Sequence, residues 1–282
     1  MIVYKYVTSA GDDIIRNLRI MVNSSRSFND PFELIPAIEN ITSEQVNQAV
    51  LKNDHYLRHI YKIGIASGRI EKSYDQFKQE NQNPERSKIV SKNMAQNTTK
   101  NMRATAKKSR EDVDRVALMA CFCGETIDNH HEILMWAHYA EGYKGLRIAF
   151  DSNMLNSPST PLIEMKYSKD RLRLNPIDYW KNGIQSLNKF YGEMLTAKSS
   201  AWAYENEYRW LVPVSLCKKD GRYYYVPIDS KAIIGIDCGV QCSEERISYI
   251  KKLVQSNLGE STFIRKTVID DYEYKLKYID SI

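Results

Sequence analysis

The chain has 282 residues, of which 27% are charged and 43% are apolar, and its formal net charge is +5. This composition is ordinary for a soluble globular protein of one large domain. It excludes a membrane-spanning class, because no apolar run approaches the roughly 20 residues that a membrane helix requires. The first residues also lack the order of a secretion signal, so we expect a cytoplasmic protein with no membrane partner.

The first forty residues predict a strand at 2–7, a helix at 10–18, a strand at 19–25 and a turn at 27–33. Asn29, Asp30 and Pro31 form the turn, because Asn and Asp bond their own backbone and Pro fixes its φ angle.

A mostly helical, polar block is expected at 42–112 as an insertion between two strand-rich parts. Thr42 and Gln45 form a capping box at its start, and Pro84 breaks it. Its residues 86–110 include eight basic side chains and no acidic one, so the formal net charge of the rest of the chain is −3. They predict a surface helix or a mobile arm. The eight are Arg86, Lys88, Lys92, Lys100, Arg103, Lys107, Lys108 and Arg110.

Strands and helices alternate after this block. We expect strands at 116–123, 145–151, 163–168, 202–210, 222–228 and 232–239, and two more at the C-terminal end. Helices are expected at 131–140, at 177–196 and after Ser243, whose side chain would cap the last one. Because strands outnumber the helices between them, the pattern predicts a single α+β domain with a mixed, largely antiparallel sheet, flanking helices and the helical insertion.

The stretch "WAYENEYRW", residues 202–210, combines aromatic and charged residues in alternation. A strand over these residues would place Glu205, Glu207 and Arg209 on one side, with the two carboxylates roughly 6 to 7 Å apart. One interpretation is a solvent-facing pair worth only about 0 to 1 kcal/mol. The other, which we favour, is a functional cleft in which the carboxylates bind a sugar or a cationic centre.

Common signatures of nucleotide-binding folds and classical hydrolases are missing from the sequence. Five cysteines fit reduced thiols better than a disulfide framework. The spacing of Cys121 and Cys123 before His130, His131 and His138 is not that of a usual zinc site, so we expect no metal. Helix 131–140 carries His138, which is either an acid or base or a buried histidine bonded to a carbonyl.

Three stretches in chain order resemble the bacterial family of domain of unknown function 2971: "SFNDPFE" (27–33), "MWAHYAEGYKGLRIAFD" (135–151) and "KSSAWAYENEYRW" (198–210), preceded by "YKY" (4–6). The resemblance implies one shared site but no activity. The residues that it places there are Asn29, Asp30, His138, Tyr139, Lys198, Trp202, Glu207 and Arg209. Further candidates in the same stretches are Lys5, Tyr6, Trp136 and Glu205.

The Glu205-x-Glu207 pair also resembles the third motif of ADP-ribosyltransferases, in which the second glutamate binds the nicotinamide ribose. The resemblance implies an enzyme that uses NAD as a substrate, either to transfer ADP-ribose to a macromolecule or to hydrolyse the dinucleotide, as a toxin or phage-defence effector does. In this hypothesis Glu207 steadies the ribose cation and His138 orients or deprotonates the acceptor. Arg209 and Lys5 hold phosphate, and Tyr139 or Trp202 stacks on a ring.

Two alternatives remain open at this point. The basic residues of 86–110, with tyrosines as stacking platforms, would suit a nucleic-acid-binding protein without enzymatic activity. A nuclease or phosphodiesterase would need Asp30, Glu33, Glu205 and Glu207 to gather around a metal. The oligomeric state cannot be read from the sequence.

Overall fold

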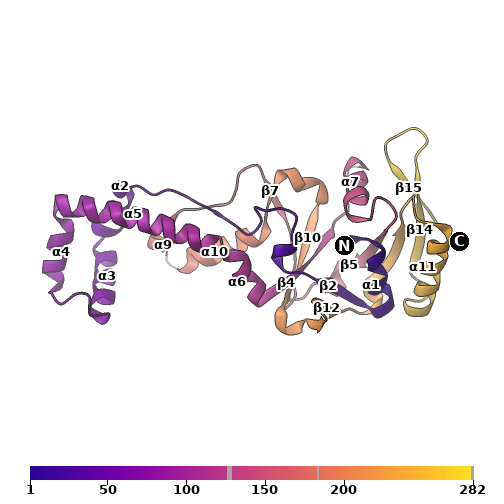
Figure 1. The fold of residues 1–282 in the computed structure, drawn as a ribbon, viewed down its shortest axis with the longest axis horizontal. Coiled ribbons are helices and arrows are strands. Elements are labelled where there is room, and N and C mark those ends of the chain that lie inside the picture. The colour runs from indigo at the N-terminus through magenta and orange to yellow at the C-terminus, as the bar shows by residue number, and fades with distance from the viewer. Residues whose placement is uncertain (126–128, 183, 281–282) are drawn as a thin grey trace. The chain divides into compact units, whose positions relative to one another are not determined.

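The computed structural model describes residues 1–125, 129–182 and 184–280, which form an α+β fold (Figure 1). Contacts divide the chain into two compact units. The first unit consists of residues 1–31, 111–169 and 198–282, and the second of residues 32–110 and 170–197. The second unit therefore contains most of the helical block expected at 42–112, together with residues 170–197 from later in the sequence.

An eight-stranded sheet is the framework of the first unit. Every neighbouring pair in it is antiparallel except β13 and β14, which are parallel. The predicted mixed, largely antiparallel sheet is thus confirmed. In spatial order its strands are β15 (Leu276–Asp280), β14 (Phe263–Ile269), β13 (Ile233–Cys238), β5 (Leu146–Asp151), β1 (Ile2–Val7), β4 (Ala117–Cys123), β10 (Glu207–Pro213) and β6 (Leu162–Glu164).

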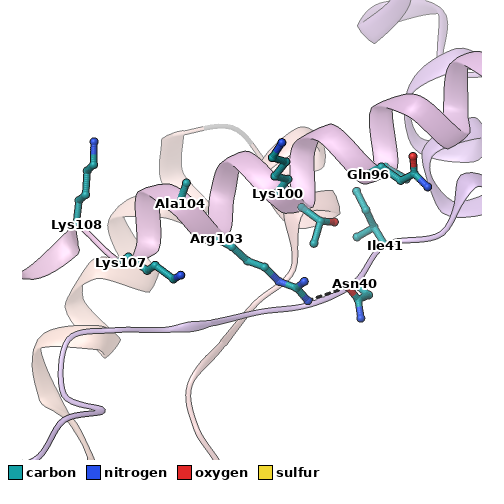
Figure 2. A pocket seen from close by; sticks show the side chains of 10 residues that line it. Asn40, Ile41, Gln96, Lys100, Arg103, Ala104, Lys107 and Lys108 are labelled. Carbon is teal, nitrogen blue, oxygen red and sulfur yellow. Dashed lines mark hydrogen bonds between the residues drawn. The ribbon is translucent and has the colours of Figure 1, made fainter.

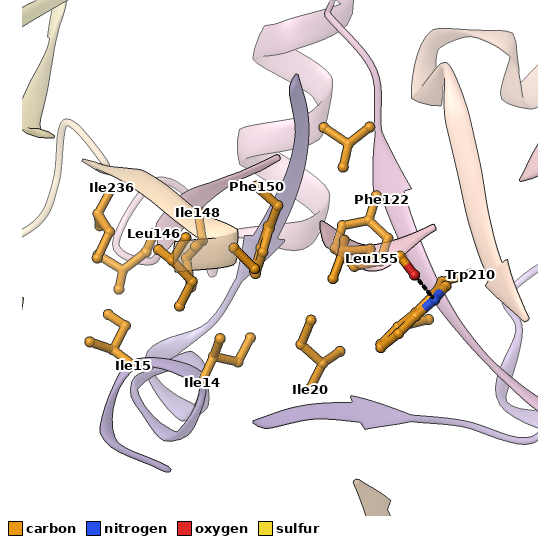
Figure 3. Close-up of a cluster of buried hydrophobic side chains, with 14 of the residues drawn as sticks. Ile14, Ile15, Ile20, Phe122, Leu146, Ile148, Phe150, Leu155, Trp210 and Ile236 are labelled. Carbon is orange, nitrogen blue, oxygen red and sulfur yellow. Dashed lines mark hydrogen bonds between the residues drawn. The ribbon is translucent and has the colours of Figure 1, made fainter. Parts of the chain in front are cut away.

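One face of this sheet carries the main hydrophobic core (Figure 3). Ile148, Phe150 and Trp210 project into this core from the strands, and helices α1 (Asp12–Asn17) and α11 (Glu244–Asn257) add apolar side chains to it. A three-stranded sheet of β11 (Lys218–Asp220), β12 (Tyr223–Pro227) and β2 (Arg19–Val22) contributes further apolar side chains. The expected helix after Ser243 is confirmed, since the Ser243 side chain accepts a hydrogen bond from the Arg246 amide.

Helix α7 (Asn129–Tyr139) packs on the opposite face, which we call the polar face. Trp136 of α7 is completely buried against Tyr6 and Cys123. Strand register places Glu207 opposite Cys123 and Arg147 opposite Tyr6. Because Cys123 and Tyr6 pack against Trp136, the charged side chains of Glu207 and Arg147 share the polar face with them. After α7, three consecutive residues (141–143) adopt left-handed backbone angles and bring the chain round towards β5.

The first unit also contains shorter elements, some of which lie at its boundaries with the second unit in the sequence. They include α8 (Ser152–Leu155), α6 (Ser109–Val116), and the strand pair β7 (Lys166–Ser168) and β9 (Ala197–Ser199). Single-turn 3₁₀ helices cover Ser9–Gly11, Ser25–Ser27, Val214–Leu216 and Ser230–Ala232, and a longer one covers Ser200–Glu205.

The second unit is helical and has its own small core, to which Leu57, Phe77 and Ile177 belong. The predicted capping box at Thr42 and Gln45 is confirmed, and Pro84 separates two helices by standing at the first position of the second one. Its elements are β3 (Ala37–Ile38), α2 (Ser43–Val46), a π-helical turn (Asn47–Leu51), α3 (Asp54–Ala66), α4 (Tyr74–Gln82), α5 (Pro84–Ala106), β8 (Arg173–Leu174), α9 (Pro176–Asn182) and α10 (Ile184–Thr196).

Three predicted elements differ from the structure. The strand expected at 202–210 begins only at Glu207, because residues 200–205 form a 3₁₀ helix and Asn206 has a left-handed φ of 42°. Asn tolerates this backbone region better than most residues. The strand expected at 163–168 is interrupted at Met165, and the helix expected at 177–196 is described as α9 and α10, with residue 183 outside the described part of the chain.

Candidate functional site

Four charged side chains gather on the polar face of the first unit, and we call them the Lys198 cluster. Lys198 Nζ donates to Glu205 Oε2 and to Glu207 Oε2, each at 2.5 Å. Arg209 binds the other oxygen of Glu207, with its Nε at 3.1 Å and its Nη2 at 3.0 Å. The exposed fractions of Lys198, Glu205, Glu207 and Arg209 are 7%, 6%, 2% and 1%. Two carboxylates and two cations therefore neutralise one another away from solvent.

The backbone explains how both glutamates reach one ammonium group. Glu205 ends the 3₁₀ helix, and the left-handed Asn206 turns the chain so that Glu207 opens β10. Lys198 lies on β9, immediately before this 3₁₀ helix. The two carboxylates thus share Lys198 without being neighbours along one strand. The structure brings both carboxylates to Lys198, but the extended strand expected over these residues is wrong for Glu205, which lies in a 3₁₀ helix.

Electrostatics keep Glu207 ionised. Burial by itself would raise its pKa, but Arg209 and Lys198 outweigh this effect and lower the pKa to about 2. The neighbouring Cys121 thiol has a raised pKa, because it is buried and stands beside the Glu207 carboxylate. Glu207 is therefore a permanent anion, whereas Cys121 is a protonated thiol that packs in the sheet.

Partly exposed aromatic side chains border the cluster, and we call His138, Tyr139, Trp202 and Tyr204 the aromatic rim. The Tyr139 hydroxyl donates to Glu205 Oε1, and burial together with this bond raises the Tyr139 pKa. The Trp202 ring centroid lies 5.6 Å from Lys198 Nζ and 6.1 Å from the Tyr204 ring. The exposed His138 contacts the Tyr204 hydroxyl through Nδ1 at 3.2 Å.

The turn at 27–31 also reaches this place. Exposed Asn29 donates its side-chain amide to the Tyr139 hydroxyl at 2.8 Å. The Phe28 ring lies under the Arg209 guanidinium, 4.6 Å from its central carbon. Asp30, next in the turn, is 2% exposed. The three stretches of the sequence resemblance therefore meet through Asn29, Tyr139 and the charged cluster.

Lys5 approaches the cluster from an unexpected direction. Strand alternation places its side chain on the core face, where its Nζ lies 5.3 Å from the Phe122 ring centroid. The same ammonium donates to the Cys121 carbonyl at 2.9 Å, in the sheet next to Glu207. Burial lowers the Lys5 pKa, and the neighbouring Cys121 and Glu207 oppose that effect. The Lys5 side chain thus contacts the core residue Phe122, whereas Glu207 and Arg209 lie on the polar face.

A second buried network, which the sequence analysis missed, lies around Arg147 on the same face. Its guanidinium pairs with Asp237 at 2.7 Å and with Glu132, and the Tyr4 and Tyr278 rings lie 4.5 and 4.3 Å from its central carbon. Tyr6 and Trp136, predicted to bind ligand, belong to this region as packed side chains. A lone arginine inside the apolar strand "LRIAF" was the available signal, because a buried cation requires partners.

The eight basic residues of 86–110 are in the second unit, on α5 and just after it. Arg86 is paired with Glu80 at 3.1 Å, and Arg110 donates to the Glu33 carbonyl at 2.8 Å. Lys88 and Lys92 are exposed on α5. The remaining four residues, Lys100, Arg103, Lys107 and Lys108, line a cavity of about 790 Å³. Of the two forms expected for this segment, the structure has the surface helix.

No group of three or more His, Cys, Asp and Glu side chains is placed to hold a metal ion within the described residues. His130, one of the histidines considered for zinc, has its side chain outside the described part of the structure. The nuclease or phosphodiesterase alternative thus lacks a ligand set there. None of the described helices combines the length and apolar character needed to cross a membrane.

Comparison with known proteins bears on the region of the cluster. The model of the family described as "Protein of unknown function (DUF2971)" matches residues 135–210. This stretch contains Trp136, the whole aromatic rim and the whole Lys198 cluster, so the resemblance is confirmed where the candidate site lies. No curated protein and no solved structure matches the chain.

Proposed function

We propose that the Lys198 cluster and the aromatic rim bind NAD or a closely related dinucleotide, and that the protein breaks the bond between nicotinamide and ribose. The observation that carries this proposal is the contact of the Tyr139 hydroxyl with Glu205. It joins a partly exposed aromatic surface to a buried pair of carboxylates. Aromatic rings suit the flat bases of a dinucleotide, and a carboxylate suits the cation that forms when the glycosidic bond breaks.

The contacts favour Glu205 over Glu207 as the carboxylate that faces the ribose. Both oxygens of Glu207 are engaged by cations, at Arg209 and Lys198. Glu205 Oε1 is held by a tyrosine hydroxyl at the partly exposed rim. A ribose hydroxyl that takes the place of the Tyr139 hydroxyl reaches Glu205 without breaking an ion pair. Glu207 then acts as a positioning residue that holds Lys198, which reverses the roles given by the ADP-ribosyltransferase resemblance.

In the proposed reaction, water or an acceptor group takes the place of nicotinamide on the ribose. The bond between ribose C1′ and the nicotinamide nitrogen breaks, and its electron pair leaves with nicotinamide, which becomes neutral. Positive charge develops on the ribose, where the Glu205 carboxylate stabilises it. An oxygen or nitrogen of the acceptor then bonds to C1′ and loses a proton, for which the exposed His138 is the nearest imidazole at the rim.

Release of nicotinamide from NAD by the 282-residue chain tests the proposal. We expect Glu205→Gln to lower the rate by about 10²-fold or more, the usual effect of removing a group that stabilises transition-state charge. Tyr139→Phe removes only a hydroxyl and should change KM more than kcat. Glu132→Gln is the matched control, because Glu132 is a buried carboxylate paired with an arginine in the other network. Thermal unfolding checks that each variant folds.

Two results would overturn the proposal. One is the absence of nicotinamide release from the folded wild-type protein, with and without added protein or nucleic-acid acceptors. The other is equal activity in the Glu205→Gln and Glu132→Gln proteins, since the cluster would then have no special part in the reaction.

A further inference from the structure

A basic cavity lies along α5 in the second unit (Figure 2). Its volume is about 790 Å³, and none of its ten lining residues is acidic. Ile41 and Ala95 give it an apolar floor, and both are largely buried. The cations Lys100, Arg103 and Lys107 are exposed around that floor, as is Lys108.

The charge of the chain is concentrated in the same unit. Residues 32–110 and 170–197 contain 18 lysines and arginines and 11 aspartates and glutamates, a formal charge of +7 in a chain whose total is +5. The first unit is therefore slightly acidic. A phosphate polymer is attracted to the helical unit and repelled, weakly, by the rest of the chain.

Helix geometry sets the size of the ligand that this surface can hold. At 1.5 Å per residue, the seven steps from Lys100 to Lys107 span roughly 10 Å along the helix axis. A row of cations on this scale contacts several successive phosphates of a polymer. Arg103 also donates to Asn40 Oδ1 at 2.8 Å, which holds the extended segment at 40–41 alongside the helix as a second wall (Figure 2).

That second wall argues against a DNA duplex. The major groove of B-form DNA is about 12 Å wide and admits one helix of about 10 to 12 Å diameter. With residues 40–41 fixed beside α5, helix and wall together exceed that width. An unpaired strand needs no such insertion, because its phosphates can follow the lysines while its base faces cover the apolar floor.

We propose that this cavity is a binding site for the backbone of single-stranded nucleic acid, without sequence preference. The inference does not depend on the activity of the Lys198 cluster. It assigns the site to the four cations that line the cavity. Arg86 and Arg110 do not line it, and they are engaged with Glu80 and the Glu33 carbonyl. Lys88 and Lys92 lie outside the cavity on the same helix.

The position of Lys88 and Lys92 supplies a matched control. The test compares two variants of the 282-residue chain, Lys100→Gln/Lys107→Gln and Lys88→Gln/Lys92→Gln. The second variant has the same net charge as the first and changes exposed residues of the same segment. Exposed substitutions of this kind change stability by less than about 0.5 kcal/mol, so both proteins should fold. Fluorescence anisotropy of a labelled 20-mer of thymidylate measures the affinity at NaCl concentrations from about 50 to about 300 mM.

Counterion release gives the expected size of the effect. Each phosphate contact on a single strand contributes about −0.7 to the slope of log K against log salt. Four contacts predict a slope of about −3 for the wild type, and the cavity variant should lose about 1.4 of it. At 0.1 M salt this corresponds to a loss of affinity on the order of 20-fold. The control variant should keep a slope near that of the wild type.

Three results would overturn the inference. The first is an equal loss of affinity in both variants, which indicates diffuse attraction. The others are equal or tighter binding of a duplex of the same sequence, and full competition by inorganic phosphate at millimolar concentration. A cavity-specific loss for the thymidylate strand, with weaker duplex binding, supports it.

Discussion

Removing the Lys198 ammonium should destabilise the first unit and reverse its response to pH. Lys198→Met keeps most of the side-chain volume but leaves Glu205 and Glu207 buried with Arg209 as their only remaining cationic partner within the cluster. Breaking a buried ion pair by removing one partner costs about 3 to 5 kcal/mol. Since Arg209 still holds Glu207, we expect a cost of about 3 kcal/mol at pH 7.

The pH dependence follows from the direction of the Glu207 shift. Its pKa in the folded wild type is lowered from 4.5 to about 2, so the stabilisation is present above pH 4.5 and is lost as the pH falls from 4.5 towards 2. Without Lys198, burial raises the pKa of one carboxylate instead. Stability is then highest when that group is protonated, and it falls as the pH rises above 4.5. Between pH 5 and 7 the wild type should be flat and the variant should lose stability.

Urea unfolding followed by tryptophan fluorescence measures both effects. Three of the four tryptophans lie in the first unit and Trp180 lies in the second, so a Trp180→Phe background restricts the signal to the first unit. Lys266→Met is the control, because Lys266 forms a partly exposed pair with Glu244 that is worth at most about 1 kcal/mol. A Lys198→Met cost no larger than that of Lys266→Met, or a flat pH profile for the variant, would refute the reasoning.

Two further substitutions test the packing of the sheet. Trp210→Phe removes the indole N–H that donates to the Leu155 carbonyl at 2.9 Å and to the Thr160 carbonyl at 3.1 Å. We expect the free energy of unfolding in the same urea assay to fall by about 1 to 3 kcal/mol. An unchanged urea midpoint would show that these bonds contribute nothing. Gly145→Ala would place a Cβ 2.1 Å from the Val7 carbonyl oxygen and 2.9 Å from that of Ala140, so the chain should express poorly or unfold at lower urea; wild-type stability would contradict the tight approach of β1 to the turn before β5.

Local sequence signals predicted many elements because their chemistry is local. The capping box at Thr42, the cap at Ser243 and the break at Pro84 depend on residues within one turn of each other, and all three are present. Apolar runs likewise identified β4, β5 and β13, whose side chains fill the core. The α+β class followed from the number and order of these elements.

The alternation of aromatic and charged residues at 202–210 led to a wrong strand prediction for residues 202–206, because two backbone structures are compatible with it. A strand of period two explains every polar position, but the left-handed Asn206 allows a 3₁₀ helix to deliver Glu205 to the same ammonium group. Sequence periodicity cannot report a single backbone angle. The partner of both glutamates, Lys198, was identified only through the family resemblance, since its ion pairs with the end of the 3₁₀ helix and the start of β10 depend on tertiary structure.

The Arg147 network shows the same limit on a larger scale. Its members come from β1, β5, α7, β13 and β15, and they meet only when the sheet is assembled. The sequence gives a reason to look for partners, because an arginine in a buried strand cannot stay unpaired. It does not say which of the 35 acidic residues of the chain are chosen.

The decisive measurement is a structure of the protein with a non-hydrolysable NAD analogue bound. We expect a base of the analogue to lie against Trp202 or Tyr204 and a ribose hydroxyl to replace the Tyr139 hydroxyl at Glu205 Oε1. An analogue bound elsewhere on the molecule, or one that leaves the contact between Tyr139 and Glu205 in place, would contradict it.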